Sequence, residues 1–423
     1  MKEDLLHYIW QFGLYATSEL ATVENDILYV VHPGTHNMNA GPDFLESTLV
    51  INNQKWVGNV EIHMNASDWY LHQHEKDPNY DAVILHVVWN HDVEVYMKGN
   101  QPLPTFELKN FVSQKLLKKY KTLFRADSRW IPCDNQIGSI PSFNLKLWLE
   151  RLYFERLEQK TIAVQELLET SKNDWEAVLF QMLAKSFGSR VNGEAMLAVA
   201  ESIEISVLRK EMHDPLRFSA LLYGQAGLLE GQIEDTYYEQ LREEYLYVKH
   251  KYGLKGVSKG QLQFFRMRPH NFPTVRIAQL VSLYTQKSHL FAAIVAAKEL
   301  DEYYKLFDVQ VSEYWKYHFN FGKESKPSPK KLTKAFIDLL IINTILPLKF
   351  QYLKSIGKLN DGEIIHVISK IKPERNSILD KFSELGIKAE NVMESQALLE
   401  LKNSYCASKR CLKCAIGKIL LKE

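Results

Sequence analysis

The 423-residue sequence contains only four cysteines, and it has no run of about 18 uncharged apolar residues. The missing run argues against a membrane-spanning helix. The opening stretch MKEDLLHYIWQFGLY carries acids where a signal peptide needs a basic start and an apolar core. Three of the cysteines lie within nine residues near the C-terminus, a placement that argues against the disulfide framework of a secreted protein. We therefore expect a cytoplasmic protein that does not associate with membranes.

Arginine is absent from residues 1–110, which hold five lysines and fifteen acids, a formal charge of −10. The same segment holds eight of the fourteen histidines. An acidic segment repels a phosphate backbone unless a divalent ion or a basic neighbour intervenes. Residues 111–130 are such a neighbour, because they contain six Lys or Arg against one Asp.

The length and the change of pattern along the chain predict several domains. We expect an α+β, multidomain protein. Its predicted parts are a mixed-sheet α/β domain (residues 1–110), a basic linker (111–141), a large all-helical domain (142–405) and a cysteine-bearing tail (406–423).

Within the first domain, the apolar patterns predict a helix over residues 4–15 and a strand over 27–34. Residues 47–64 read as a hairpin turning at 52–54, and residues 82–89 as a strand buried on both faces. Between them, residues 66–78 predict a short helix with Ser67 as N-cap and Pro78 as stop.

Two acids and a histidine in this domain suggest chemistry. The two-residue period of a strand places Glu61 and His63 on one face, with Val60 and Ile62 on the other. Asp43 precedes the first strand of the hairpin and reaches the same point if the two strands pair. Two carboxylates and a third polar group are what metal-dependent phosphodiester hydrolysis requires. The structural alternative is that Glu61 faces solvent and Asp43 caps a turn.

Pro42-Asp43, the hairpin, Glu61-Ile62-His63, a helix and an apolar strand together resemble the PD-(D/E)XK nuclease core. The resemblance covers about residues 1–110 and implies that Asp43 and Glu61 bind Mg²⁺ or Mn²⁺. His63 stands where that family usually has lysine, so it would orient or deprotonate water without bringing a fixed positive charge. The resemblance therefore implies either a variant active site or a core that has lost its chemistry.

Four further polar residues define a rival class of site, a His/Asp-liganded hydrolase of a small substrate. They are Asp68, His72, His74 and His86. His72 and His74 share a face if their segment is extended but not if it is helical. His86 interrupts an apolar strand and is equally explained as a hydrogen-bonded core histidine.

The C-terminal cysteines have the spacing Cys-x4-Cys-x2-Cys, which lets thiolates from one loop share a metal. A four-thiolate site, zinc or [4Fe-4S], consists of Cys133, Cys406, Cys411 and Cys414. Some nucleases related to the PD-(D/E)XK group hold an iron–sulfur cluster with one early and three late cysteines, and this arrangement is similar. The alternative is ordinary reduced thiols. In either case, we expect the nearby charges to lower the thiol pKa values; these charges are Lys409, Arg410 and Lys413.

In residues 263–280, three arginines alternate with aromatic residues, a pattern suited to binding phosphates and stacking on bases. These candidate substrate-binding residues are Arg266, Arg268 and Arg276. A structural role is the alternative, with the arginines pairing with carbonyls or acids of neighbouring helices.

Over its whole length the chain is similar to a bacterial family known as domain of unknown function 2851. The segments that carry the similarity are residues 33–44, 58–74, 80–89, 266–280 and 405–417. We thus predict a metal-dependent nuclease acting on nucleic acid. The alternatives are a non-catalytic nucleic-acid-binding or scaffold protein and the small-substrate hydrolase. Carboxylates of Asp43 and Glu61 close together favour the nuclease, whereas a separate convergence of His72, His74 and His86 favours the hydrolase.

Overall fold

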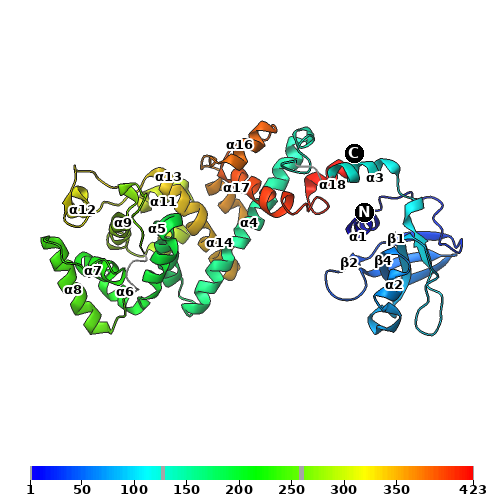
Figure 1. Cartoon of the computed structure of the whole chain (residues 1–423), viewed down its shortest axis with the longest axis horizontal. Coiled ribbons are helices and arrows are strands. Elements are labelled where there is room, and N and C mark those ends of the chain that lie inside the picture. Colours follow the sequence, from blue (N-terminus) through cyan, green and yellow to red (C-terminus); the bar gives the residue numbers. More distant parts are fainter. Residues whose placement is uncertain (1, 125–128, 257–261, 423) are drawn as a thin grey trace. The chain divides into compact units, whose positions relative to one another are not determined.

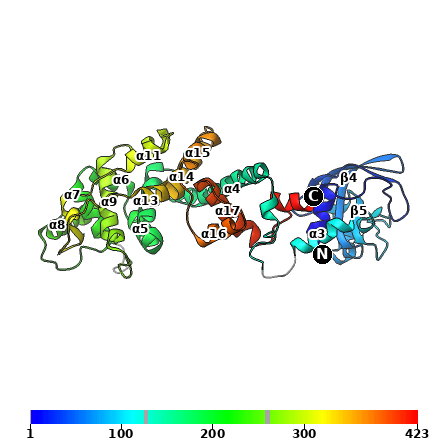
Figure 2. The same ribbon diagram turned by 90° about the horizontal axis from the view of Figure 1, so that it is seen from above.

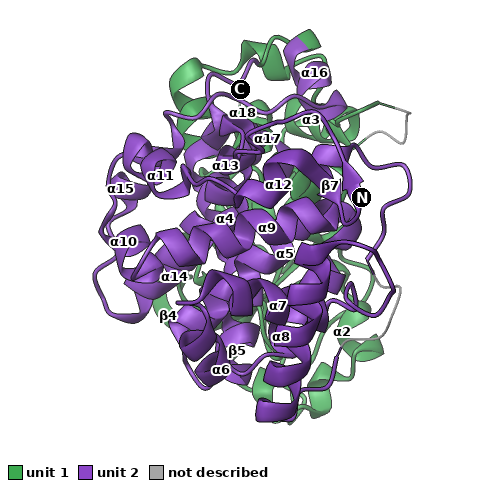
Figure 3. Cartoon of the chain, turned by 90° about the vertical axis from the view of Figure 1, so that its left-hand side faces the viewer, with its two compact units in different colours: residues 1–148, 384–387, 401–423 green, residues 149–383, 388–400 purple. Residues whose placement is uncertain are grey.

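The computed structural model describes residues 2–124, 129–256 and 262–422. The chain forms two compact units, which Figure 3 draws in different colours. Figure 1 colours the same chain by position in the sequence. Unit 1 comprises residues 1–148, 384–387 and 401–423, and unit 2 comprises residues 149–383 and 388–400. Unit 1 contains a mixed sheet and unit 2 is mainly helical, so the fold is α+β and multidomain, as predicted.

The elements of unit 1 come from both ends of the chain. They are α1 (Glu3–Gln11), β1 (Leu28–His32), β2 (Thr35–His36), β3 (Phe44–Ile51), β4 (Gln54–Asn65), α2 (Asp68–Leu71), η1 (His74–Lys76), η2 (Pro78–Tyr80), β5 (Val83–Asn90), β6 (Thr105–Glu107), η3 (Leu108–Asn110), α3 (Gln114–Leu123), η4 (Ile137–Ser139), the π-helix η7 (Leu401–Cys406) and α18 (Ala415–Lys422).

The sheet runs in the order β1-β3-β4-β5-β6, and β2 also pairs with β3. The first pairings are antiparallel, whereas β4 with β5 and β5 with β6 are parallel. The predicted hairpin is confirmed. Its turn residues Asn52 and Asn53 have φ of 48° and 66°, the left-handed conformation that a tight hairpin turn requires. This turn sets the register from Ile51 with Gln54 to Ser47 with Gly58, and a register shift between Ser47 and Phe44 then pairs Phe44 with Val60, beside Glu61.

One helix packs on each face of the sheet. Trp10 of α1 lies 6.4 Å from the ring of Phe106, which pairs with Val87 on one face. On the other face Trp69 of α2 lies 5.5 Å from the ring of His86. Figure 1 shows α1, α2 and the sheet grouped together within unit 1. The face under α2 therefore carries the polar side chains of β4 and β5.

The predicted short helix of residues 66–78 is broken in the structure. Helix α2 ends at Leu71, and Gln73 adopts the left-handed conformation (φ 60°, ψ 32°) before η1 begins. The hydroxyl of Ser67 donates to Asp92 Oδ2 at 2.7 Å. Ser67 is the N-cap residue, as predicted, but without a capping bond from its side chain, and the predicted stop at Pro78 is wrong.

The predicted basic linker and tail form part of unit 1. Helix α3 begins at its N-cap Ser113, which accepts from the N–H of Leu116. It buries Leu116, Tyr120 and Leu123 and packs beside α18, as two views show (Figure 1, Figure 2). Residues 125–128 of the basic segment lie outside the described residues. Lys115, Lys118, Lys119 and Lys121 of this segment thus lie on an amphipathic helix with a buried face.

Unit 2 contains the remaining helices and one small ribbon. They are α4 (Ser142–Thr170, whose first turns to Trp148 belong to unit 1), α5 (Trp175–Glu201), α6 (Ile205–Glu211), α7 (Pro215–Gln225), α8 (Thr236–Tyr252), η5 (Pro269–Asn271), α9 (Pro273–Gln286), α10 (Leu290–Ala296), α11 (Leu300–Phe307), α12 (Glu313–Tyr317), β7 (His318–Asn320), β8 (Lys323–Glu324), α13 (Lys334–Leu340), the π-helix η6 (Ile341–Ile345), α14 (Leu346–Ser355), α15 (Asp361–Ile368), α16 (Ser377–Glu384, which ends in unit 1) and α17 (Val392–Glu400).

Two features of unit 2 differ from expectation. The β7–β8 ribbon means that the region is not entirely helical. The continuous helix Lys334–Ser355 is long and apolar enough to cross a membrane, but 67% of its most apolar window is buried inside the protein. That burial is typical of a core helix, so this single segment is weak evidence for a membrane span.

Candidate carboxylate–histidine site

The acids Asp43 and Glu61 are held together by two reciprocal hydrogen bonds. The N–H of Asp43 donates to Glu61 Oε2 at 3.0 Å, and the N–H of Ile62 donates to Asp43 Oδ2 at 3.0 Å. Each carboxylate therefore binds the backbone beside the other acid. The structure brings these two predicted residues together at the end of β3 and in the middle of β4.

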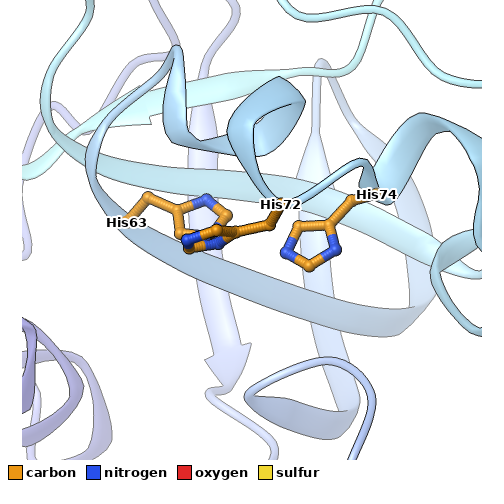
Figure 4. Close-up of side chains that lie close together, drawn as sticks. All are labelled: His63, His72 and His74. Carbon is orange, nitrogen blue, oxygen red and sulfur yellow. The ribbon is translucent and has the colours of Figure 1, made fainter.

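Three histidines complete the cluster next to Glu61. Glu61 Oε1 lies 3.4 Å from His63 Nε2 and 3.4 Å from His74 Nε2. His63 Nε2 lies 3.1 Å from His72 Nδ1. One ring nitrogen from each of these histidines lies within 4.8 Å of the others. Figure 4 shows the three rings close together. The predicted alternation along β4 is therefore confirmed, because Glu61 and His63 share a face.

Gln73 explains how His72 and His74 reach the same point. A regular helix points residues i and i+2 in different directions. The left-handed conformation of Gln73 turns the chain between them, so both rings face His63. The ring of His74 is then stacked on Tyr80 with centroids 3.7 Å apart, and this contact fixes its orientation.

His86 supports the cluster from behind. Its Nε2 lies 2.9 Å from His63 Nδ1, and parallel pairing places His86 opposite Glu61. The second nitrogen of a metal-binding histidine usually contacts such an outer partner. Asp68 has a different role, because its Oδ2 accepts from the N–H of Asn65 at 2.9 Å. The two predicted sites therefore merge into one cluster, with His86 behind it and Asp68 capping the end of β4.

Helix α1 adds two residues that sequence reasoning missed. His7 Nε2 lies 3.2 Å from Asp43 Oδ2. Burial raises the pKa of Glu3 to about 7; His7 opposes this rise, and the nearby carboxylates of Asp43 and Glu61 add to it. Glu3 and His7 are four residues apart and so lie on one helix face. That spacing was the available signal, but it does not reveal which strand the helix faces.

The electrostatics of the cluster follow from its burial. Burial raises the pKa of Glu61, although a hydrogen bond from His74 opposes the rise. Burial, with His74 and His72 nearby, lowers the pKa of His63 to about 3. His63 is therefore neutral at physiological pH. For His7, burial disfavours the cation, but the bond to Asp43 and the negative charges of Asp43, Glu3 and Asp4 together outweigh burial and raise the pKa.

The donor set fits a divalent metal ion. Carboxylate oxygens suit Mg²⁺ and Mn²⁺, whereas imidazole nitrogens suit zinc and other transition metals. His63, His72 and His74 supply three nitrogens close enough to share one ion, and Glu61 supplies an oxygen 3.4 Å from two of these rings. Asp43 is joined to this group through its N–H, which donates to Glu61. This mixed set fits Mn²⁺ better than Mg²⁺, which prefers oxygen ligands alone.

The three arginines predicted to bind substrate have different environments. Arg266 and Arg268 are exposed in the segment before α9. Arg276 is 8% exposed, donates to Gln279 Oε1 at 2.9 Å and to Asn271 Oδ1 at 2.8 Å, and is therefore engaged within unit 2. Its geometry fits the structural alternative rather than contact with a substrate.

The four cysteines all lie in unit 1 and line one cavity. The expectation that nearby charges lower their pKa values is wrong. Burial raises the pKa of Cys133 to about 12 and that of Cys411 to about 12, and it also raises the pKa values of Cys406 and Cys414. Lys409 does lower the pKa of Cys411, but by less than burial raises it.

The fold and this cluster define an α+β protein with a buried carboxylate–histidine site on a mixed sheet. The chain belongs to the family described as protein of unknown function (DUF2851), whose model matches residues 3–377. The predicted family is therefore confirmed. Of the five segments that suggested it, residues 405–417 lie outside the matched range. No curated protein and no solved structure matches the chain.

Proposed function

We propose that unit 1 is a metal-dependent nuclease, which hydrolyses phosphodiester bonds in nucleic acid at the carboxylate–histidine cluster. The observation that carries this proposal is the convergence of Asp43 and Glu61 with His63, His72 and His74. A divalent ion held by the carboxylates and by imidazole nitrogens supplies positive charge beside the scissile phosphate and lowers the pKa of nearby water.

The protein's own groups have separate roles in this proposal. Asp43 and Glu61 hold the ion, and their mutual backbone bonds fix both carboxylates before it binds. His63 is neutral at physiological pH and, with a pKa lowered to about 3, is a weak base, so we assign it to orienting the attacking water rather than to deprotonating it. His86 orients the His63 ring through its other nitrogen. In the PD-(D/E)XK core, which this part resembles, the corresponding residue is usually lysine.

A groove between α3 and α18 supports nucleic acid as the substrate. It has a volume of about 360 Å³ and is lined by Lys115, Lys118 and Lys119, together with Thr122 and Leu421. Lysines bind the phosphate backbone without regard to base sequence. This groove supplies within unit 1 the positive charge that residues 1–110 lack. The four unpaired cysteines fit a reducing compartment, so we place the activity in the cytoplasm.

The test is Mn²⁺-dependent cleavage of mixed DNA and RNA by the full chain and by Glu61→Gln. We expect the substitution to lower the rate by about 100-fold or more and to weaken Mn²⁺ binding in calorimetry, because it removes a ligand oxygen charge. The matched control is Glu24→Gln, an exposed residue of the same unit, which should change neither. Circular dichroism checks that both variants fold.

Two outcomes would replace the proposal. Cleavage of small phosphate esters but of no nucleic acid would favour a hydrolase of a small substrate, which the clustering of three histidines also allows. A wild-type protein that neither binds Mn²⁺ nor cleaves any substrate would favour a scaffold or binding role. In that case the cluster is a structural network of buried polar groups.

A further inference from the structure

The four cysteines meet in unit 1 although they are far apart in the sequence. Cys133 lies in the turn that precedes η4, and the other three cysteines lie between the end of η7 and the start of α18. All four line one small cavity of about 10 Å³. The exposed fraction is 7% for Cys133, 7% for Cys411 and 6% for Cys414. No disulfide joins them.

The backbone around the late cysteines is shaped to present sulfur. The N–H groups of Ile416 and Gly417 donate to the sulfur of Cys414 and so lower its pKa against the effect of burial. A Cβ on Gly417 would lie 2.1 Å from the carbonyl oxygen of Cys411. Only glycine allows the Cys411–Cys414 turn to lie this close to α18. Such N–H groups stabilise a thiolate rather than a thiol.

The segment that carries Cys133 is held beside the late cysteines by other contacts. Lys402 Nζ donates to the carbonyl oxygen of Trp130 at 2.6 Å, and its ammonium lies 4.9 Å from the Trp130 ring centroid. The N–H groups of Gln136 and Ile137 donate to the carbonyl of Cys133. These contacts place Cys133 at the cavity without any bond between sulfurs.

We propose that Cys133, Cys406, Cys411 and Cys414 ligate one metal centre through four thiolates. Four thiolates are the ligand set of a structural zinc ion and of a [4Fe-4S] cluster. Zinc binds each of four sulfurs at about 2.3 Å, whereas a [4Fe-4S] cluster also carries four sulfide ions, so the metal and sulfide content distinguishes the two. Lys409 and Arg129 beside Cys411, and Lys418 beside Cys414, offset the negative charge that such a centre retains.

The centre would fix the C-terminal segment to the region after the sheet. Helix α18 follows Cys414 directly and packs on α3, so the same ligands would hold the lysine groove between α3 and α18. Its role is structural and is separate from the carboxylate–histidine cluster. The two sites can therefore be tested independently.

The experiment is metal analysis of the full chain purified without oxygen. We expect either four iron and four sulfide per chain, with the visible absorption of an iron–sulfur cluster, or one zinc per chain and no such absorption. Cys133→Ala and Cys411→Ala should each lose most of the metal. The matched control Ser408→Ala, an exposed position in the same loop, should keep it.

Three results would overturn the proposal. The first is wild-type protein that holds neither iron nor zinc in stoichiometric amount, a result that does not depend on whether any variant folds. The second is a disulfide among these cysteines in freshly purified protein. Full metal content in Cys133→Ala would show that the early cysteine is not a ligand. Glu61→Gln separates this proposal from the nuclease, because it should lose Mn²⁺ binding and keep the cysteine-bound metal.

Discussion

Arg276 shows at the level of one residue how burial decides between two roles. Its guanidinium lies 3.8 Å from the centroid of the Phe336 ring and donates to Gln279 and Asn271. Burial lowers its pKa to about 10, still above physiological pH. We expect Arg276→Met to reduce the free energy of unfolding by about 2 kcal/mol, because it leaves the buried amide of Gln279 without this donor and removes a cation–π contact.

Urea unfolding measures this loss, and the exposed Arg268→Met is the matched control, expected within about 0.5 kcal/mol of wild type. If residues 263–280 bind single-stranded DNA, Arg268→Met should weaken that binding more than Arg276→Met does. An Arg276→Met protein of wild-type stability that has lost DNA affinity would restore its substrate-binding role.

Lys160 in unit 2 gives a second prediction at this scale. Its ammonium donates to Gln396 Oε1, Asn343 Oδ1 and the carbonyl of Ile342, all neutral acceptors. Burial, together with Arg156, lowers its pKa to about 7. Above that pH the folded state has released a proton that the unfolded state keeps up to its own pKa of about 10.4. The lowered pKa therefore makes the protein more stable as pH rises from about 7 towards 10.

We expect the unfolding free energy of wild type, minus that of Lys160→Met, to rise as pH increases from about 7 to about 9. Taking the difference between the two proteins removes the contributions of other titrating groups, which both share. Unfolding in urea at several pH values provides the measurement. A difference that stays level, or that falls with pH, would mean that Lys160 keeps its proton in the folded state.

At the scale of elements, the turn between β3 and β4 joins the two strands that bring Asp43 next to Glu61. Asn53 has a φ of 66°, which costs a residue with a Cβ about 1 kcal/mol unless its side chain is suited to the turn. We expect Asn53→Ala to lower the melting temperature and Asn53→Gly to keep or raise it. Equal melting temperatures for the two variants would indicate that the turn conformation does not limit stability.

The hairpin and the shared face of Glu61 and His63 could be predicted, because both follow from local rules: turn chemistry and the two-residue period of strands. The meeting of His72 and His74 could not. It depends on Gln73 in the left-handed conformation, and glutamine gives no sequence signal for that conformation as glycine or asparagine does. The contact of His7 with Asp43 was likewise hidden, because it depends on how a helix packs on a sheet.

At the scale of the whole molecule, the composition predicted a sheet-bearing first part and a helical remainder, but not which segments share a core. Residues 111–141 read as a linker because their lysines dominate the composition, whereas Leu116, Tyr120 and Leu123 form a buried face. Residues 406–423 read as a tail, although they belong to unit 1. Contacts across some 270 residues of sequence are not visible in local patterns, as for Lys402 with Trp130.

Because unit 1 includes the C-terminal segment, we predict that removing this segment destabilises the unit. A chain that ends after Glu400 lacks α18, whose Ile416, Leu420 and Leu421 are buried. Burial of each such side chain contributes about 1.5–3 kcal/mol, so unit 1 should lose on the order of 5 kcal/mol. Hydrogen exchange should then increase in α3 and β4, while α5 and α9 in unit 2 keep their protection. A chain that ends after Leu421 retains these buried residues and is the control. Unchanged exchange in α3 and β4 of the shorter chain would mean that unit 1 is stable without its C-terminal segment.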